Sequence, residues 1–75
     1  MELCHNQLTG FDVSKSKSLS YLNCEGNQFT AAAFDALFET LHSNNIEGKV
    51  IDVFDNPGAG KCNREIAKEK EWDIY

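Results

Sequence analysis

Apolar and polar residues alternate over a short stretch in the first third of the chain. Leu22 and Cys24 are separated by one polar residue, within the pattern Leu19-x-x-Leu22-x-Cys24-x-x-Asn27-x-Phe29. Alternation with a period of two is typical of a strand that has one buried and one exposed face. The pattern therefore predicts a short strand that turns Leu22 and Cys24 toward a core and ends before a turn at Asn27.

The same pattern recurs along the chain. The tetrapeptide NQLT at 6–9 returns as NQFT at 27–30, which aligns Asn6 with Asn27. A third copy, Ile51-x-Val53-x-x-Asn56, follows the second after a longer interval, and Trp72-x-Ile74 repeats its alternation near the end. Because self-similarity of this kind indicates a repeated structural unit, we expect the strands to stack side by side.

The longer interval before the third copy carries a helical pattern. Its apolar residues recur at i, i+3, i+4 and i+7, which is typical of an amphipathic helix: Phe34, Leu37, Phe38 and Leu41. We expect this helix to span Ala31 to His42, with Thr30 as its N-cap and His42 in its last turn. The polar run Ser43-Asn44-Asn45 predicts its end, and a second, short helix is expected from a cap at Asn63 through Lys70.

Together these units follow the pattern L-x-x-L-x-L-x-x-N-x-L, with Cys24 at one leucine position. At this level the chain resembles the leucine-rich repeat family, in the 21-residue form found in bacterial surface proteins. The ending IAKEKEWDIY also resembles the closing segment of such arrays. The resemblance implies an α/β fold, a short solenoid with a parallel sheet on its concave face and helices or loops on its convex side.

The resemblance also implies an organisation and a role. The chain would be a single leucine-rich-repeat module at 1–75, with two 21-residue-type repeats at 1–30, a longer helix-containing repeat at 31–56 and a C-terminal cap at 57–75. It would bind protein, without catalysis, as part of a bacterial protein that is secreted or displayed at the cell surface. The N-terminus, MELCHNQLTG, has no signal-peptide pattern, so an export signal would lie outside this chain.

Three asparagines fall where each predicted strand turns away from the sheet. Such turns leave backbone N–H and C=O groups without ladder partners. A carboxamide both donates and accepts hydrogen bonds, so stacked asparagines can serve neighbouring units. We therefore assign a structural ladder to Asn6, Asn27 and Asn56.

The outward-facing residues of the strands form the candidate binding surface. The alignment places Asp73 in the row of Glu2, Asn23 and Asp52, and Tyr75 in the row of Cys4, Glu25 and Phe54. Aromatic side chains among polar ones are typical of protein-binding patches, but ordinary exposed strand positions explain them equally well. The candidates are Tyr21, Asn23, Glu25, Val50, Asp52, Phe54, Asp73 and Tyr75.

The net charge of the chain limits the kinds of macromolecule that it can bind. The 75 residues carry 7 basic and 12 acidic side chains, a net charge of −5. Nucleic acid and anionic membranes need a clustered basic face, so the charge fits a basic or neutral protein partner better, or no partner. No apolar run approaches the length of a membrane span. The first strand, near Leu3, begins almost at Met1, and we expect self-association through this uncapped edge.

The sequence gives little support for disulfides, metal sites or catalysis. Cys4, Cys24 and Cys62 form neither a disulfide framework nor a zinc pair, and we interpret them as free thiols. Asp52, Asp55 and Asn56 do not match a calcium loop. We expect no metal and no cofactor, and no catalytic pair of residues is apparent.

Two alternatives to protein binding remain. The chain is purely structural if it only closes a longer repeat array. It is a fragment of a nucleotide-binding enzyme if the segment from Pro57 to Cys62 is a phosphate loop. The pattern G-x-x-x-x-G-K-[ST] would need glycine at Asp55 and serine or threonine at Cys62, so we interpret this segment as a turn.

Overall fold

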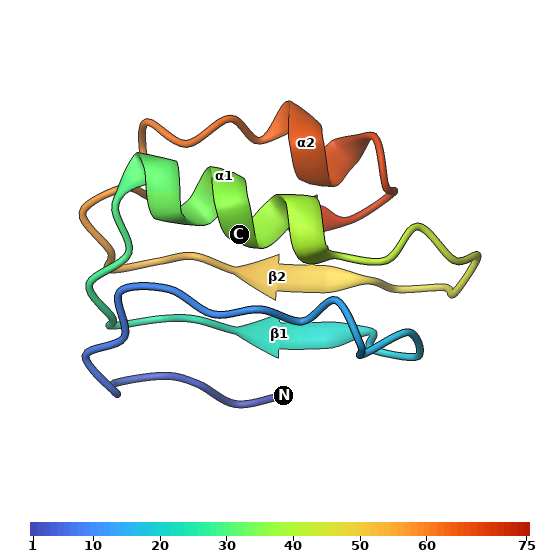
Figure 1. Ribbon diagram of the computed structural model, residues 1–75, viewed down its shortest axis with the longest axis horizontal. Helices are drawn as coiled ribbons and strands as arrows, with labels where there is room; N and C mark the ends of the chain where they lie inside the picture. Colours follow the sequence, from blue (N-terminus) through green and yellow to red (C-terminus); the bar gives the residue numbers. More distant parts are fainter.

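The computed structural model describes residues 1–75 as a three-stranded parallel sheet with two helices (Figure 1). Along the chain the order is β1, α1, β2, α2 and β3, and the strands lie in the order β1-β2-β3. The N-terminal segment lies beside β1 through a single bridge between Glu2 and Asn23. The predicted α/β class and the predicted parallel sheet are confirmed. The bounds are β1 Tyr21–Asn23, α1 Ala31–Thr40, β2 Val50–Asp52, α2 Glu65–Lys68 and β3 Asp73–Ile74.

The strand expected near Leu3 is not formed, since this segment makes only the isolated bridge at Glu2. The pairing of the N-terminal segment and of β2 with β1 nevertheless follows the predicted alignment of the repeated units. Glu2 lies opposite Asn23, and Leu22 lies opposite Ile51. The predicted register of the last strand is wrong by two residues, because Ile74 rather than Trp72 lies opposite Ile51. Trp72 is buried just before β3, where its indole Nε1 donates to the carbonyl oxygen of His42 at 3.0 Å. This packing holds Trp72 beyond the strand and shifts β3 along β2.

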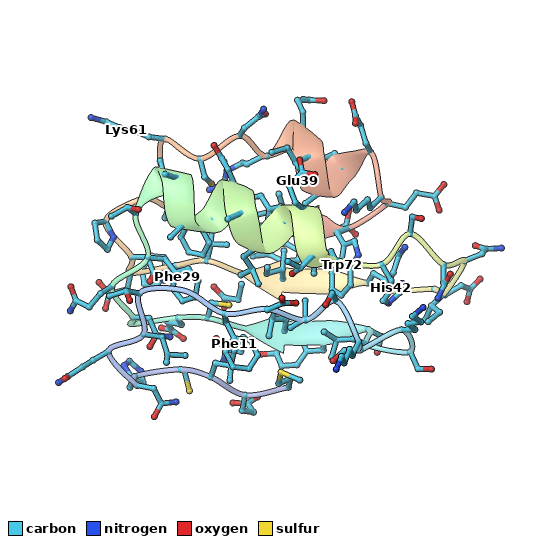
Figure 2. All side chains as sticks on the ribbon, in the orientation of Figure 1. Phe11, Phe29, Glu39, His42, Lys61 and Trp72 are labelled. Carbon is cyan, nitrogen blue, oxygen red and sulfur yellow. The ribbon has the colours of Figure 1, made fainter.

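The core lies between one face of the sheet and α1. Strand residues with the predicted period of two point into it, and the apolar side of α1 covers them. Three rings stack in series, Phe29 on Phe34 with centroids 4.8 Å apart and Phe34 on Phe38 at 5.8 Å. In Figure 2, Phe29 lies at one end of the sheet and Trp72 at the other. The core residues are Val13, Leu22, Cys24, Phe29, Phe34, Leu37, Phe38, Leu41, Ile51, Val53, Ala67 and Trp72.

Helix α1 begins where the sequence predicted. The Thr30 side chain accepts a hydrogen bond from the N–H of Ala33, which satisfies one free donor of the first turn. The predicted end at His42 is wrong, since the helix stops at Thr40 and Leu41 is extended. The Thr40 hydroxyl donates to the carbonyl oxygen of Leu37 at 2.6 Å and accepts from the N–H of Val13 at 3.2 Å. The end of the helix is thus bound to the segment that precedes β1.

The second helix is shorter than predicted. It covers Glu65–Lys68 rather than Asn63 to Lys70, although the Asn63 side chain accepts from the N–H of Glu65 at 3.2 Å. Beyond it, Lys70 reaches back to α1 and donates to the carbonyl oxygens of Phe38 at 3.1 Å and Glu39 at 2.7 Å. Lysine at the carbonyl end of a helix satisfies free acceptors there. No helix in the chain combines the length and apolar character needed to cross a bilayer.

Candidate functional site

One face of the sheet is left without a covering layer, and we call its outward-pointing residues the open face. Three aromatic side chains stand out on it, with 41% of Tyr21, 65% of Phe54 and 67% of Tyr75 exposed to solvent. Core residues alternate with them along each strand, so the period of two holds on both faces of the sheet. The open face consists of Glu2, Cys4, Tyr21, Asn23, Glu25, Val50, Asp52, Phe54, Asp73 and Tyr75.

Strand register arranges this face in rows. Tyr21, Val50 and Asp73 are aligned in the first row. The expectation that Asp73 lies in the same row as Asp52 is therefore wrong. The packing of Trp72 before β3, described above, accounts for the difference. Tyr75 takes that place instead, because its N–H donates to the carbonyl oxygen of Ile51 at 2.9 Å.

The second row thus reads Glu2, Asn23, Asp52 and Tyr75. The expectation that Tyr75 joins Phe54 is also wrong. In the third row, the N–H of Gly26 donates to the carbonyl oxygen of Phe54 at 3.1 Å, which sets Phe54 beside Glu25. All eight candidate residues of the sequence therefore lie on one continuous face, in a different order from that expected.

The charges of the open face have one sign. Glu2, Glu25, Asp52 and Asp73 lie on it, and none of its positions carries lysine or arginine. One oxygen of Asp52 accepts from the N–H of Phe54 at 2.9 Å, so the carboxylate is held close to the backbone. Asn23 makes the equivalent bond to the N–H of Glu25 at 3.0 Å.

The pKa of the Tyr21 hydroxyl is affected by loss of water and by the carboxylates of the open face. Removal of water around its hydroxyl, together with the charges of Glu2 and Asp52, raises the pKa of Tyr21. Carboxylates from both sides of β1, one in the N-terminal segment and one in β2, therefore act on one aromatic side chain of the face.

Asn27 stands at the turn after β1 and bonds across to the N-terminal segment. Its Oδ1 accepts from the N–H groups of Asn6 and Leu8, both at 3.0 Å. Its Nδ2 donates to the carbonyl oxygens of Leu3 at 2.8 Å and Cys24 at 2.9 Å. This one side chain, which is 3% exposed, joins two turns.

Asn56 repeats this role after β2. Its Oδ1 accepts from the N–H of Phe29 at 3.1 Å, and its Nδ2 donates to the carbonyl oxygens of Cys24 at 2.8 Å and Val53 at 3.0 Å. Asn6 differs, because it is exposed and its side chain makes no hydrogen bond within the chain. Of the three ladder candidates, two bond through their side chains and Asn6 contributes only its N–H.

The residue before each of these asparagines adopts the left-handed conformation. The φ angles are 57° at His5, 71° at Gly26 and 58° at Asp55. Left-handed backbone is unfavourable for a residue with a Cβ, and aspartate tolerates it better than most. The three turns thus share a backbone shape as well as an asparagine, which the sequence signals only at Gly26.

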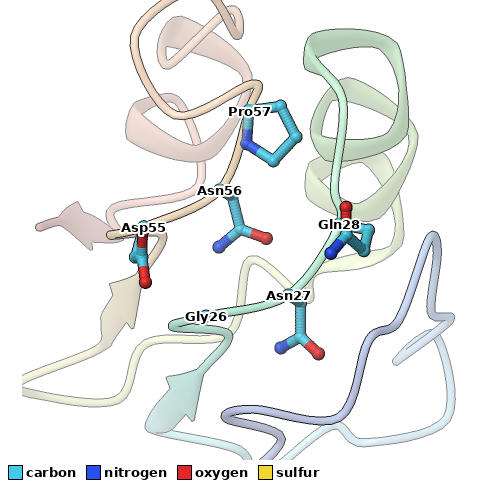
Figure 3. Close-up of a pocket in the computed structure, with 6 residues that line it drawn as sticks. All are labelled: Gly26, Asn27, Gln28, Asp55, Asn56 and Pro57. Atoms are coloured by element: carbon cyan, nitrogen blue, oxygen red, sulfur yellow. The ribbon is translucent and has the colours of Figure 1, made fainter.

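A shallow polar depression of about 430 Å³ separates the second and third turns (Figure 3). The amide groups of Asn27 and Asn56 each point toward the preceding unit and are already bonded to backbone groups there. Its lining has one carboxylate and no hydrophobic residue: Gly26, Asn27, Gln28, Asp55, Asn56 and Pro57. Such a lining lacks the apolar surface by which small ligands are usually held.

The segment after Pro57 does not present its amides to a phosphate. The N–H of Gly58 donates to the carbonyl oxygen of Phe29 at 2.8 Å, and the N–H groups of Lys61 and Cys62 donate back to Gly58. A phosphate-binding loop needs these groups free and convergent. The segment instead forms a closed turn against the start of α1.

Lys49 and His42 form a polar cluster that sequence reasoning missed. The Lys49 side chain is only 2% exposed, and its Nζ donates to the carbonyl oxygens of Asn44 at 2.8 Å and Lys70 at 2.6 Å. It lies 5.8 Å from the ring centroid of Trp72, a cation–π distance. Lys49 precedes Ile51 by two positions, so the strand alternation could have placed it inward.

His42 was expected in the last turn of α1, and that expectation is wrong. It lies beyond the helix, where its Nε2 bonds to the carbonyl oxygen of Leu19 at 2.6 Å and its Nδ1 accepts from the N–H of Asn44 at 3.1 Å. Its ring packs edge-on against Trp72 with centroids 5.6 Å apart. The two residues lie near each other in Figure 2. The histidine therefore links the loop before β1 to the loop before β2.

The cysteines form no disulfide, and they do not combine with acidic residues or histidines into a metal site. Cys4, Cys24 and Cys62 are all free, and no group of three His, Cys, Asp or Glu side chains could hold a metal ion. Burial raises the pKa of Cys24 to about 12 and raises that of Cys62 as well. A thiol with a raised pKa is a poor nucleophile near neutral pH.

Comparison with protein-family models, with curated proteins and with solved structures found no match to this chain.

Proposed function

We propose that this chain is a protein-binding module of leucine-rich-repeat type, which binds its partner through the open face. The observation that carries the proposal is the exposure of Tyr21, Phe54 and Tyr75 on one sheet face. Exposed aromatic side chains among polar ones are the usual anchors of protein interfaces. No catalytic step belongs to the proposal.

The repeat character of the proposal is supported by the turns. Asn27 and Asn56 each bond to the preceding unit, and each follows a left-handed residue. Stacked units of this kind support one another and form an extended outer surface. By the same resemblance, we assign the module to the solenoid class and to a bacterial protein that is secreted or held at the cell surface.

A random-peptide display library selected against the whole chain tests this function. Clones that bind the native chain should lose binding to the double variant Phe54→Ser and Tyr75→Ser. They should keep binding to Phe11→Ser, which removes an aromatic side chain that is 39% exposed outside the open face. Selected clones that bind both variants equally would contradict the proposal, and so would the recovery of no binding clone.

A structural role is the second candidate, favoured by the way residues 57–75 close the core. Ala67 and Trp72 are buried there, and Lys70 bonds to two carbonyl oxygens of α1. If no clone depends on the open face, while Lys70→Met lowers the free energy of unfolding, the structural role alone accounts for the chain.

A further inference from the structure

We propose that the open face recognises arginine side chains of an extended polypeptide segment. This inference rests on the function proposed above and names the chemistry of the partner. It follows from how aromatic and acidic side chains are distributed over the rows of the face, and from what the face lacks.

Each aromatic side chain of the face has a carboxylate at a neighbouring position. Tyr75 is aligned with Asp52 across β2 and β3, and Phe54 with Glu25 across β2 and the end of β1. Tyr21 lies close enough to Glu2 and Asp52 to feel both charges. A ring face beside a carboxylate is the arrangement that binds an organic cation, by cation–π attraction and ion pairing together.

No basic side chain of the chain itself occupies these positions. None of the ten residues of the open face is lysine or arginine. The nearest buried cation, Lys49, points away from the face and donates to the carbonyl oxygens of Asn44 and Lys70. The four carboxylates of the face therefore have no basic side chain among their neighbours on it, and a cationic partner is complementary to them.

Arginine fits these positions better than lysine. Its planar guanidinium stacks on an aromatic ring while its N–H groups reach a carboxylate at the side, and it loses less hydration energy than an ammonium. One oxygen of Asp52 accepts from the N–H of Phe54, and the second oxygen makes no hydrogen bond within the chain. Anionic polymers and lipid surfaces are excluded by the four carboxylates of the face.

The spacing of the rings suits an extended peptide. At ordinary strand spacing, Tyr21 and Phe54 are about 14 Å apart and Tyr75 and Phe54 about 8 Å apart. Side chains on one side of an extended peptide repeat about every 6.7 Å. Arginines at every second position can therefore reach more than one ring.

Three synthetic peptides test the inference: ten residues of alternating serine and arginine, and matched peptides with lysine or citrulline. Each is titrated into the whole chain at 150 mM salt and followed by backbone amide shifts. We expect the arginine peptide to bind at least about fivefold more tightly than the lysine peptide, and the citrulline peptide not to bind. Shifts should concentrate at Tyr21, Asp52 and Tyr75.

A matched pair of variants distinguishes the effect of a carboxylate on the open face from the effect of net charge on peptide binding. Asp52→Asn and Asp12→Asn each remove one negative charge, and each leaves an oxygen to accept from the N–H two positions on, at Phe54 and Ser14 respectively. Asp52→Asn should weaken binding of the arginine peptide about threefold or more, whereas Asp12→Asn should leave it nearly unchanged. Equal effects of both variants would overturn the inference.

Equal affinities for the arginine and lysine peptides, or shifts spread over the whole surface, would also overturn it. The display selection distinguishes this failure from failure of the proposed function. Face-dependent clones that contain no arginine would overturn the arginine proposal and leave protein binding in place. A lack of any face-dependent clone would remove both.

Discussion

Gly58 donates its backbone N–H to the carbonyl oxygen of Phe29 at 2.8 Å, which brings the turn after β2 directly against the start of α1. A Cβ at Gly58 would collide with the backbone of Thr30 and Ala31. Backbone cannot yield as a flexible side chain does, so the contact restricts this position to glycine.

Gly58→Ala should therefore lower the free energy of unfolding by about 2–3 kcal/mol. Gly60→Ala is the matched control, because a Cβ there meets no atom within 4 Å. Urea denaturation of the two variants measures the difference. Equal midpoints for Gly58→Ala and Gly60→Ala would show that the turn is not packed against α1.

Asn27→Ala should cost about 1–3 kcal/mol, because it leaves the N–H groups of Asn6 and Leu8 and the carbonyl oxygen of Leu3 without a partner. The carbonyl oxygen of Cys24 keeps its bond from Asn56. Asn6→Ala makes the same chemical change at an exposed side chain that has no such bonds, and we expect almost no effect. Thermal melting compares them. A melting temperature of Asn27→Ala equal to that of the wild type would remove the role assigned to this side chain.

Gly26 and Gly48 have nearly the same left-handed backbone, with φ of 71° and 69°, but different surroundings. Gly48→Ala should cost about 1 kcal/mol from backbone strain alone. Gly26→Ala should cost more, because the new Cβ would meet the ring of His5. The excess should disappear when His5→Ala is combined with Gly26→Ala, as a double-mutant cycle measured by urea denaturation would reveal.

Lys70→Met should lower the free energy of unfolding by about 1–2 kcal/mol, because the bonds of Nζ to the carbonyl oxygens of Phe38 and Glu39 are lost. Lys68→Met changes the charge equally at an exposed side chain in α2 and serves as the control. Amide hydrogen exchange in the last turn of α1 should accelerate only in Lys70→Met. Faster exchange in both variants would point to net charge instead.

Stability should decline in alkaline solution. Burial raises the pKa of Cys24 from 9.0 to about 12, so above pH 9 the unfolded chain releases this proton while the native chain keeps it. The native state then binds more protons, and the free energy of unfolding falls with pH, by about 1 kcal/mol at pH 10.

Urea denaturation between pH 8 and pH 10 measures this slope. Cys24→Ala should reduce it, and the remainder should come from Cys62 and Tyr21, whose pKa values are also raised. An unchanged slope in Cys24→Ala would contradict the assignment.

Much of the sheet was determined by local sequence. Alternation around Leu22 and Ile51 has a period of two, which by itself decides which side chains face the core. The equal distance from each strand to its asparagine, Asn27 or Asn56, then predicts the register of β1 on β2. Thr30 likewise marks the start of α1, because capping involves only the first turn of the helix.

Tertiary contacts alone decided the rest, since they join segments that lie far apart in the sequence. Trp72 packs on His42, and β3 lies two residues away from its expected register, so Asp73 and Tyr75 each lie one row away from the expected one on the open face. The end of α1 depends on Thr40 and Lys70, whose partners no local pattern identifies. Sequence thus determined which residues the open face contains, and long-range packing determined which of them are neighbours.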